Sequence, residues 1–189
     1  MGRWQPDARG RLLKAALELY GEHGFEQTTV AQIALRAGLT ERTFFRHFAD
    51  KREVLFAGAS ALQERMVSAV AAAPEGATPI EAAAAGIEAA GALIQEGGEL
   101  PRQRRSIIAA SVELQERELI KLAALASALA DVLRRRGVSE PMASLAAEAA
   151  VAAFKIGFDR WVDSGNERDL PQTIRASLEA LKAVSAGRT

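Results

Sequence analysis

The chain has 189 residues and a formal net charge of zero, because 24 Lys and Arg residues balance 24 Asp and Glu residues. It contains no cysteine, which excludes disulfides, thiolate nucleophiles and cysteine-based metal sites. The zero net charge is only weak evidence against a nucleic-acid partner, since residues 1–55 hold nine basic against seven acidic side chains and both histidines.

Composition and hydrophobic pattern favour an all-α chain. Aromatic residues make up only 5% of the sequence, whereas alanine, leucine, glutamate and arginine, which lose little rotamer freedom in helices, are abundant. No segment shows the strict alternation of a β-strand. The start lacks an apolar signal core, and no run reaches the about 18 apolar residues of a membrane span, so we expect a cytoplasmic protein without a membrane partner.

The first expected helix begins at Pro6, where the missing N–H of proline costs nothing, and ends near Glu22, before Gly24. The stretch "TTVAQIALRAGLT" then predicts a short second helix. Either Thr28 or Thr29 caps its N-terminus through the side-chain hydroxyl.

A tight turn at Gly38 leads into a third expected helix, which Thr40 caps and which runs from Glu41 to about Phe48. Two helices joined by a Gly-containing turn of about three or four residues are typical of a helix-turn-helix. This pattern covers about residues 29–48.

A fourth, longer helix is expected from Lys51 to about Ala72, with Asp50 as its cap. Groups of Gly and Pro then separate the later helices, since each group ends one helix and starts the next. The later helices are expected at about residues 80–96, 102–111, 114–136, 140–164 and 171–186. The predicted architecture is a small N-terminal three-helix unit, a connecting helix and a larger helical bundle.

The third helix has two different faces when its residues are placed about 100° apart. Phe44 and Phe48 share one face and are expected to pack inward, while Phe45 lies at the edge. The outward face carries cationic and hydrogen-bonding side chains: Arg42, Thr43, Arg46 and His47. An ordinary solvated helix is the alternative, but an exposed aromatic ring beside arginines favours a surface that reads nucleic acid.

The segment from Arg9 to Phe56 resembles the DNA-binding domain of TetR/AcrR-family transcriptional regulators. The residues that carry the resemblance are "LLKAALELYGEHGFEQTTVAQIALRAGLTERTFFRHFADKREVL", about a quarter of the chain. The resemblance implies a helix-turn-helix domain at residues 6–56 and an effector-binding and dimerisation domain at 57–189. It also implies a ligand-responsive repressor that binds a palindromic double-stranded DNA operator as a homodimer, with no metal and no cofactor.

The resemblance implies roles for single residues. It places Thr43, Phe45, His47 and Lys51 at phosphate-contacting positions, Thr29 and Thr40 at the starts of the two motif helices, and Arg42 and Arg46 at base-reading positions. The family often has glycine where this chain has Arg42, and tyrosine where it has Phe45. Arginine can pair bidentately with guanine, so Arg42 contacts either a base or a phosphate.

The resemblance also favours dimerisation through the last two helices. Small and apolar side chains follow one side of each helix: Leu145, Ala149, Ala152, Ile174, Leu178 and Leu181. Four such helices from two subunits would form a bundle. The alternative is that these side chains belong to the core of a single chain.

A small-molecule effector is the other partner that the resemblance implies. The candidate pocket residues are mainly bulky and apolar: Met66, Ile94, Arg105, Ile108, Leu122, Phe154, Phe158 and Trp161. The helical spacing of the three aromatic residues is more typical of a core than of a pocket. Residues 101–137 are faintly similar to TetR members that sense acyl-CoA-like molecules, and their Arg102, Arg104 and Arg105 form either a site for an anion or a salt-bridged face with the acids at 113–118.

An enzyme and a protein-binding helical adaptor are the alternatives from other functional classes. The sequence lacks H-E-x-x-H, a phosphate-binding glycine loop and G-x-S-x-G, and it has only two histidines, so we expect no enzyme. An adaptor that binds protein through the N-terminal unit stays open at this stage.

Overall fold

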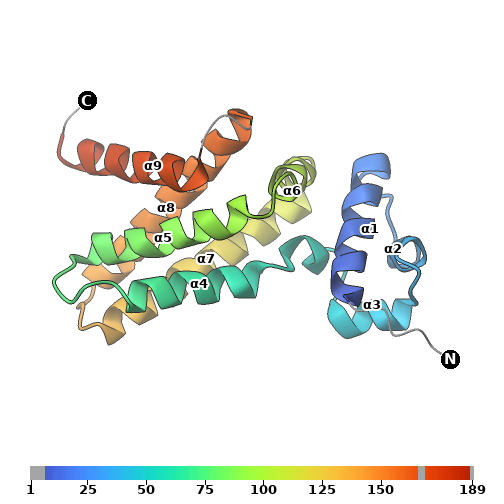
Figure 1. Cartoon of the computed structure of the whole chain (residues 1–189), viewed down its shortest axis with the longest axis horizontal. Coiled ribbons are helices and arrows are strands. Elements are labelled where there is room, and N and C mark those ends of the chain that lie inside the picture. The colour runs from blue at the N-terminus through green and yellow to red at the C-terminus, as the bar shows by residue number, and fades with distance from the viewer. Residues whose placement is uncertain (1–6, 166–168, 188–189) are drawn as a thin grey trace. The chain divides into compact units, whose positions relative to one another are not determined.

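A computed structural model describes residues 7–165 and 169–187, and every regular element in these ranges is a helix (Figure 1). None of these helices is both long and apolar enough to cross a membrane. The chain forms two compact units. The first unit comprises residues 7–58 and Arg102–Glu118, and the second unit comprises Ala59–Pro101 and residues 119–187.

The first unit begins with α1 (Ala8–His23), whose N-cap is Asp7. The Asp7 carboxylate accepts a hydrogen bond from the Gly10 N–H at 2.8 Å, so the helix starts at Ala8 rather than at the predicted Pro6, which lies outside the described residues. Gly24 ends the helix with a φ of 81°, a left-handed conformation that suits glycine.

Two short helices follow, and each begins at a threonine cap. Thr29 and Gln32 form a reciprocal capping box at the start of α2 (Val30–Arg36), which decides the alternative between Thr28 and Thr29. The Thr28 hydroxyl is buried and instead donates to the Gly24 carbonyl at 2.8 Å. Thr40 caps α3 (Glu41–His47), as the sequence predicts.

The prediction of one helix from Lys51 to Ala72 is wrong. The structure has a short 3₁₀ helix, η1 (Glu53–Phe56), and a separate helix, α4 (Ala59–Ala71). The consecutive residues Val54, Leu55 and Phe56 are all buried. Three consecutive residues spread widely around the axis of any helix, so η1 is enclosed by its neighbours on more than one side, which an amphipathic stripe in the sequence does not reveal.

Two further helices contribute to both units. Their bounds are Leu100–Ala109 for α6 and Val112–Arg135 for α7. The part from Arg102 to Glu118 belongs to the first unit, although the predicted division at residues 56 and 57 assigns it to the second domain. It is joined to η1 by hydrogen bonds from Arg104 to the Leu55 carbonyl and from Arg117 to Glu53, and an amphipathic pattern does not reveal such contacts.

The second unit is built from α4, α5 (Pro79–Gln95), the later part of α7, α8 (Met142–Asp163) and α9 (Leu170–Ser185) (Figure 1). The helices from α5 to α9 begin and end within two residues of the predicted ranges. Alanine and glycine let these helices approach closely. A Cβ atom added to Gly157 on α8 would lie 2.7 Å from the Cα atom of Ile174 on α9.

Candidate nucleic-acid interface

The outward face of α3 carries cations that no described residue neutralises. Arg42 and Arg46 are exposed, and neither forms an ion pair or a hydrogen bond with another described residue. Phe45 lies beside them with 56% of its surface exposed. Two free guanidinium groups and an exposed ring on one short helix can donate to anionic or base-edge acceptors and make apolar contacts at the same time.

The inward face of α3 fixes the direction of these side chains. Phe44 is 0% exposed and Phe48 is 4% exposed, and their ring centroids are 5.6 Å apart. The Arg9 guanidinium lies over the Phe48 ring at 5.5 Å and donates to the Ala57 carbonyl at 2.6 Å. The predicted division between inward Phe44 and Phe48 and outward Phe45 is confirmed.

Threonine hydroxyls mark the start of both motif helices. Thr40 accepts a hydrogen bond from the Thr43 N–H at 3.2 Å, and their two hydroxyls are 3.1 Å apart. Thr29 has the same role in α2, where its hydroxyl oxygen accepts a hydrogen bond from the Gln32 N–H at 3.2 Å. Thr29 and Thr40 are exposed, so both can also meet a ligand.

His47 lies in the last turn of α3 and is half-buried. Its Nε2 atom is buried and has no hydrogen-bond partner among the described residues. The phosphate contact predicted for His47 therefore cannot use Nε2 in this conformation, and it remains a prediction for the rest of the ring.

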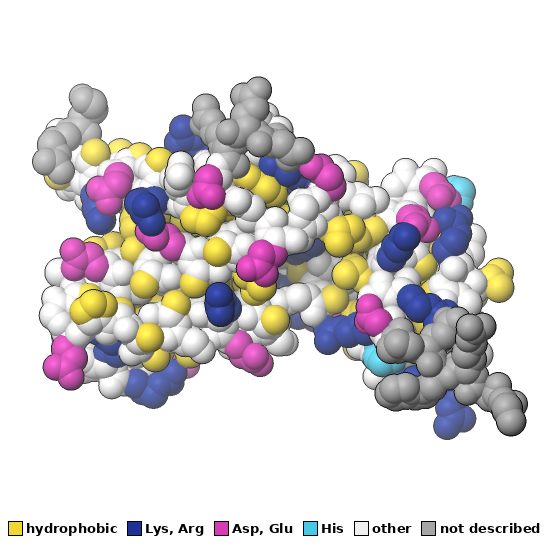
Figure 2. Space-filling view, in the orientation of Figure 1, with side chains coloured by type: hydrophobic (Ala, Val, Ile, Leu, Met, Phe, Trp, Pro, Cys, Tyr) yellow, Lys and Arg dark blue, Asp and Glu magenta, His cyan; other side chains and the backbone are white. Residues whose placement is uncertain are grey.

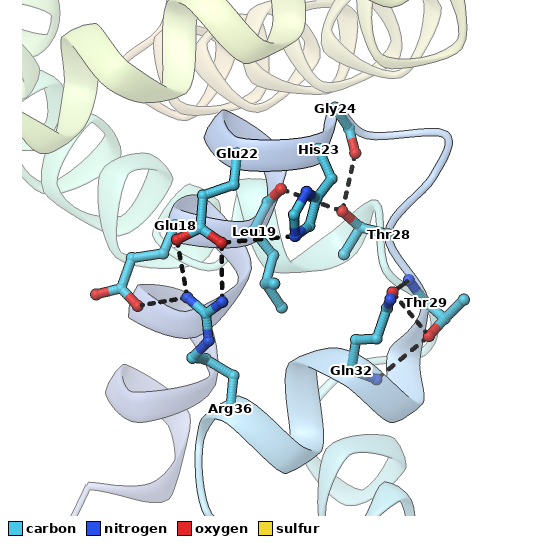
Figure 3. Close-up of polar contacts among 9 residues, drawn as sticks. All are labelled: Glu18, Leu19, Glu22, His23, Gly24, Thr28, Thr29, Gln32 and Arg36. Atoms are coloured by element: carbon cyan, nitrogen blue, oxygen red, sulfur yellow. Dashed lines mark hydrogen bonds and ion pairs between the residues drawn. The ribbon is translucent and has the colours of Figure 1, made fainter.

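A polar network joins α1 to α2 (Figure 3). Arg36 donates to the two carboxylate oxygens of Glu22 at 3.0 and 2.8 Å and approaches Glu18 at 3.4 Å. The hydrogen bonds from Arg36 hold the pKa of the Glu22 carboxyl below its usual value. Arg36 is thus occupied within the first unit, unlike Arg42 and Arg46.

Lys51 points into the first unit. Its Nζ atom donates to the carbonyl oxygens of Phe25, Glu26 and Thr28 at 2.9, 3.3 and 3.1 Å. An ammonium group has three N–H donors, so all of them are bound. The phosphate contact predicted for Lys51 stays a prediction, and in this conformation the ammonium group is held by backbone carbonyls.

The arginines at the start of α6 include one with a clear structural role. Arg104 donates from Nε to the Leu55 carbonyl at 2.6 Å and from Nη1 to Glu118 at 3.3 Å, and it lies 4.9 Å from the centre of the Phe56 ring. Burial lowers the pKa of its guanidinium. For Arg104 the salt-bridged alternative is right, because the Glu118 carboxylate already neutralises this cation.

The predicted effector residues fall into both units. Arg105 and Ile108 belong to the first unit, and the other six belong to the second. In the second unit Met66, Phe154 and Trp161 are part of the buried core, and the remaining three pack partly buried against it: Ile94, Leu122 and Phe158. Phe158 joins the two other aromatic rings, with its centroid 6.5 Å from Phe154 and 5.8 Å from Trp161. A pocket among them remains a prediction.

The predicted dimer residues also separate into two groups. Leu145 is 65% exposed, Ala152 is exposed and Ala149 is half-buried, so this side of α8 faces outward. Ile174 and Leu178 are 0% and 2% exposed and lie in the core of the same chain, which corrects their assignment to a surface; Leu181 packs partly buried against that core. Their spacing on α9 looks the same for a core and for an interface.

Two exposed residues extend the α8 stripe. Met142 and Ile156 are each 53% exposed. Together with Leu145, Ala149 and Ala152 they recur at i, i+3, i+7, i+10 and i+14, the spacing of a two-helix seam. The same count along the sequence would have identified both residues.

The part of the chain that the structure describes holds no group of three or more His, Cys, Asp or Glu side chains that could bind a metal ion.

Comparison with known proteins matches a family model to the helix-turn-helix region. The model for bacterial regulatory proteins of the tetR family matches residues 12–57. The HTH-type transcriptional regulator TcmR of Streptomyces glaucescens is 39% identical over 89 residues, which is 47% of this chain and 39% of TcmR. Rv2250c, an uncharacterized HTH-type transcriptional regulator of Mycobacterium tuberculosis, is 34% identical over 55 residues, or 29% of each chain. The chain thus matches less than half the length of these curated relatives.

Solved structures resemble nearly the whole chain. SmeT, the repressor of the Stenotrophomonas maltophilia multidrug efflux pump SmeDEF, was solved in complex with triclosan and has a TM-score of 0.66 at 22% identity, covering 94% of this chain and 90% of SmeT. The transcriptional regulator FadR of Bacillus subtilis, solved with stearoyl-CoA, has a TM-score of 0.63 at 21% identity and covers 91% of this chain and 96% of FadR. Likenesses at these identities concern the fold.

Proposed function

We propose that this chain, which belongs to the TetR/AcrR family of transcriptional regulators, is a ligand-responsive repressor that binds palindromic double-stranded DNA as a homodimer. The observation that carries the proposal is the outward face of α3. Arg42 and Arg46 have no ion-pair partner among the described residues, while Arg9, Arg36 and Arg104 all have partners within the first unit. Free cations beside an exposed aromatic ring fit a polyanion with base edges.

The proposed contacts divide by chemistry. Arg42 and Arg46 reach base edges in the major groove, where an arginine can donate bidentately to guanine O6 and N7. The hydroxyls of Thr29, Thr40 and Thr43 and the His47 ring meet phosphates, which fix the register of the protein on the duplex. Phe45, with no hydroxyl, contacts sugar or a thymine methyl group through its exposed ring.

A homodimer supplies the second recognition helix. The exposed apolar stripe of α8 supports it: Met142, Leu145, Ala149, Ala152 and Ile156. Figure 2 shows hydrophobic, acidic and basic side chains interspersed over the visible face of the second unit. Two α3 helices about 34 Å apart would read successive major grooves.

The proposed effector is a small, largely apolar molecule that binds in the second unit. Support comes from the bulky side chains around the core, of which Ile94, Leu122 and Phe158 are only partly buried. SmeT was solved with triclosan and FadR with stearoyl-CoA, whose acyl chain is apolar, which makes an acyl-CoA-like molecule one candidate. Preferential binding to the DNA-incompetent state would release the operator.

A gel-shift titration with DNA from upstream of the protein's own gene tests the proposal. We expect a retarded complex whose affinity falls steeply with salt, and a loss of about 1–3 kcal/mol for Arg42→Ala or Arg46→Ala. Arg65→Ala, an exposed arginine on α4, is the matched control and should bind as the wild type does. Absence of retardation at low salt, without effector, would contradict the proposed function.

A further inference from the structure

We propose that Glu41 is a specificity-determining residue for DNA binding: its carboxylate accepts a hydrogen bond from the N4 amino group of a cytosine in the operator. This inference rests on the proposed function and deepens it, because it names a base that one side chain reads. Glu41 is exposed and lies in the first turn of α3, one residue after the Thr40 cap. It is the only acidic residue between positions 27 and 49 of the chain.

The Glu41 carboxylate forms no hydrogen bond and no ion pair within the part of the chain that the structure describes. Most carboxylates of the first unit, in contrast, lie within 4 Å of an arginine nitrogen: Glu18, Glu22, Asp50, Glu53, Glu113 and Glu118. The ion pairs that hold this unit together therefore do not account for Glu41. A free carboxylate on a surface proposed to meet a polyanion needs a different explanation, because phosphates repel it.

The geometry of α3 keeps this carboxylate apart from the two free arginines. Successive residues point about 100° apart around a helix, so Glu41 and Arg42 do not face each other. Phe45 lies one turn after Glu41, about 40° from Glu41 and about 60° from Arg42 on the same wheel. The exposed Phe45 ring thus separates the acid from the arginine, and each can reach its own acceptor or donor on a ligand.

A carboxylate discriminates among the four bases because it offers only acceptors. In the major groove cytosine presents the N4 amino donor, whereas guanine and thymine present acceptors. Adenine presents its N6 donor next to the N7 acceptor, and the N7 lone pair repels a carboxylate. Glu41 therefore favours cytosine. Arg42 and Arg46 offer only donors and suit guanine, so the acid adds a contact that the arginines cannot make.

An acidic side chain in the first turn of a helix also interacts favourably with the helix dipole. That role and base reading predict different results when Glu41 is replaced. If Glu41 only stabilised the start of α3, its replacement would change binding to every DNA sequence by the same factor. If Glu41 reads a base, its replacement changes the preference at one base pair of each half-site and at no other.

The first experiment selects duplexes from a randomised DNA library and sequences those that bind. We expect the wild-type protein to select a cytosine that Glu41→Ala no longer requires, while both proteins agree at the other positions. Glu41→Gln should select adenine there, because a glutamine amide pairs with adenine N6 and N7. Glu26→Gln is the matched control: it removes another exposed carboxylate of the first unit, outside α3, and should select the wild-type sequence.

The second experiment measures the size of the effect by fluorescence anisotropy. Each protein is titrated with the selected duplex and with one in which that cytosine is replaced by thymine in one half-site. The ratio of the two affinities should be about tenfold smaller for Glu41→Ala than for the wild type. Both proteins meet the same two duplexes, so effects of the thymine methyl group and of the partner base cancel in this comparison.

Two outcomes overturn the inference alone: both Glu41 variants select the wild-type sequence, or Glu41→Ala weakens binding to the two duplexes by the same factor. Either would leave the proposed function intact and make Glu41 a residue of the helix start only. Failure of the wild-type protein to select any sequence would overturn the proposed function, and base reading by Glu41 with it.

Discussion

In the first unit long cationic side chains donate to the backbone carbonyls of neighbouring segments, whereas the helices of the second unit combine one such contact, from Arg136 to the carbonyls of Ala71, Ala73 and Pro74, with close approach at small side chains. In the first unit Arg9, Lys51 and Arg104 donate to the backbone carbonyls of Ala57, of the turn at 25–28, and of Leu55. In the second unit Gly86, Gly91 and Gly157 bring helices so close that an added Cβ would lie 2.7 Å from a neighbouring atom.

The difference follows from the length of the helices. The motif helices α2 and α3 have seven residues each, so many of their carbonyls lie at helix ends and lack intrahelical partners. Lysine and arginine supply donors for carbonyls in the segments that flank these short helices, at residues 25–28, at Leu55 and at Ala57. The helices α5 and α8, with 17 and 22 residues, have proportionally fewer unpaired carbonyls and gain more from close packing. In the first unit, therefore, the arginines that remain outside this network are the ones that mark a binding surface.

The largest expected effect concerns Phe44, one of the two buried rings that orient α3. Phe44→Ala should reduce the free energy of unfolding by about 3–5 kcal/mol, because it opens a cavity at a fully buried ring. Phe45→Ala is the matched control, one residue away and exposed, and should change stability by less than about 0.5 kcal/mol while weakening DNA binding. Chemical denaturation followed by far-UV circular dichroism measures both. Equal losses of stability would contradict the two-faced description of α3.

A smaller loss of stability is expected at Gly157, where α8 and α9 approach too closely to leave room for a side chain. Gly157→Ala should cost about 1–3 kcal/mol, since the new methyl group meets the backbone of Ile174, which no rotamer change can move. Gly76→Ala is the control, because nothing lies within 4 Å of its Cβ position. With Trp4 replaced by phenylalanine, the fluorescence of Trp161 follows unfolding of this unit. If both variants unfold at the same denaturant concentration, the close approach of the Ile174 backbone does not exclude a methyl group at position 157.

The smallest effect concerns the ionic contact between α1 and α2. The pKa of Glu22 is lowered in the folded state, first by its hydrogen bonds from Arg36. A lowered folded-state pKa means that this contact stabilises the protein above about pH 4.5, the range of a free glutamate, and that the stabilisation is lost as pH falls through the folded-state value. Thermal melts between neutral and acid pH should show a weaker acid dependence for Glu22→Gln. Arg36→Met should reduce the pH dependence of the melting temperature by the same amount. If both variants keep the wild-type pH dependence, the Glu22–Arg36 contact does not contribute to it.

Local patterns predicted much of the fold and of the candidate interface. Helix caps at Thr29 and Thr40 and the inward position of Phe44 depend on residues within about one turn of each other, which periodicity and side-chain type reveal. The exposed Arg42 and Arg46 follow from the same helical wheel. Their contacts with DNA remain predictions.

The failures concern contacts between residues far apart in the chain. The prediction of a helix from Lys51 did not include a contact with Tyr20, 31 residues away. The Tyr20 hydroxyl donates a hydrogen bond to the Lys51 carbonyl. Ile174 and Leu178 have the spacing of an interface and of a core alike, and only the neighbouring α5 and α8 place them in the core.

The amino-acid sequence by itself determined the helical class, the helix-turn-helix and the two faces of α3, because each depends on local spacing and caps. Only the tertiary structure decided which cations are free. Arg36, Lys51 and Arg104 look as available as Arg42 and Arg46 in a helical pattern, yet their partners lie 14 to 26 residues away in the chain, or 49 for the Leu55 carbonyl. A charge on a helix face becomes a binding group only when the folded chain leaves its donors unsatisfied, and that depends on which backbone carbonyls and carboxylates the fold brings within reach.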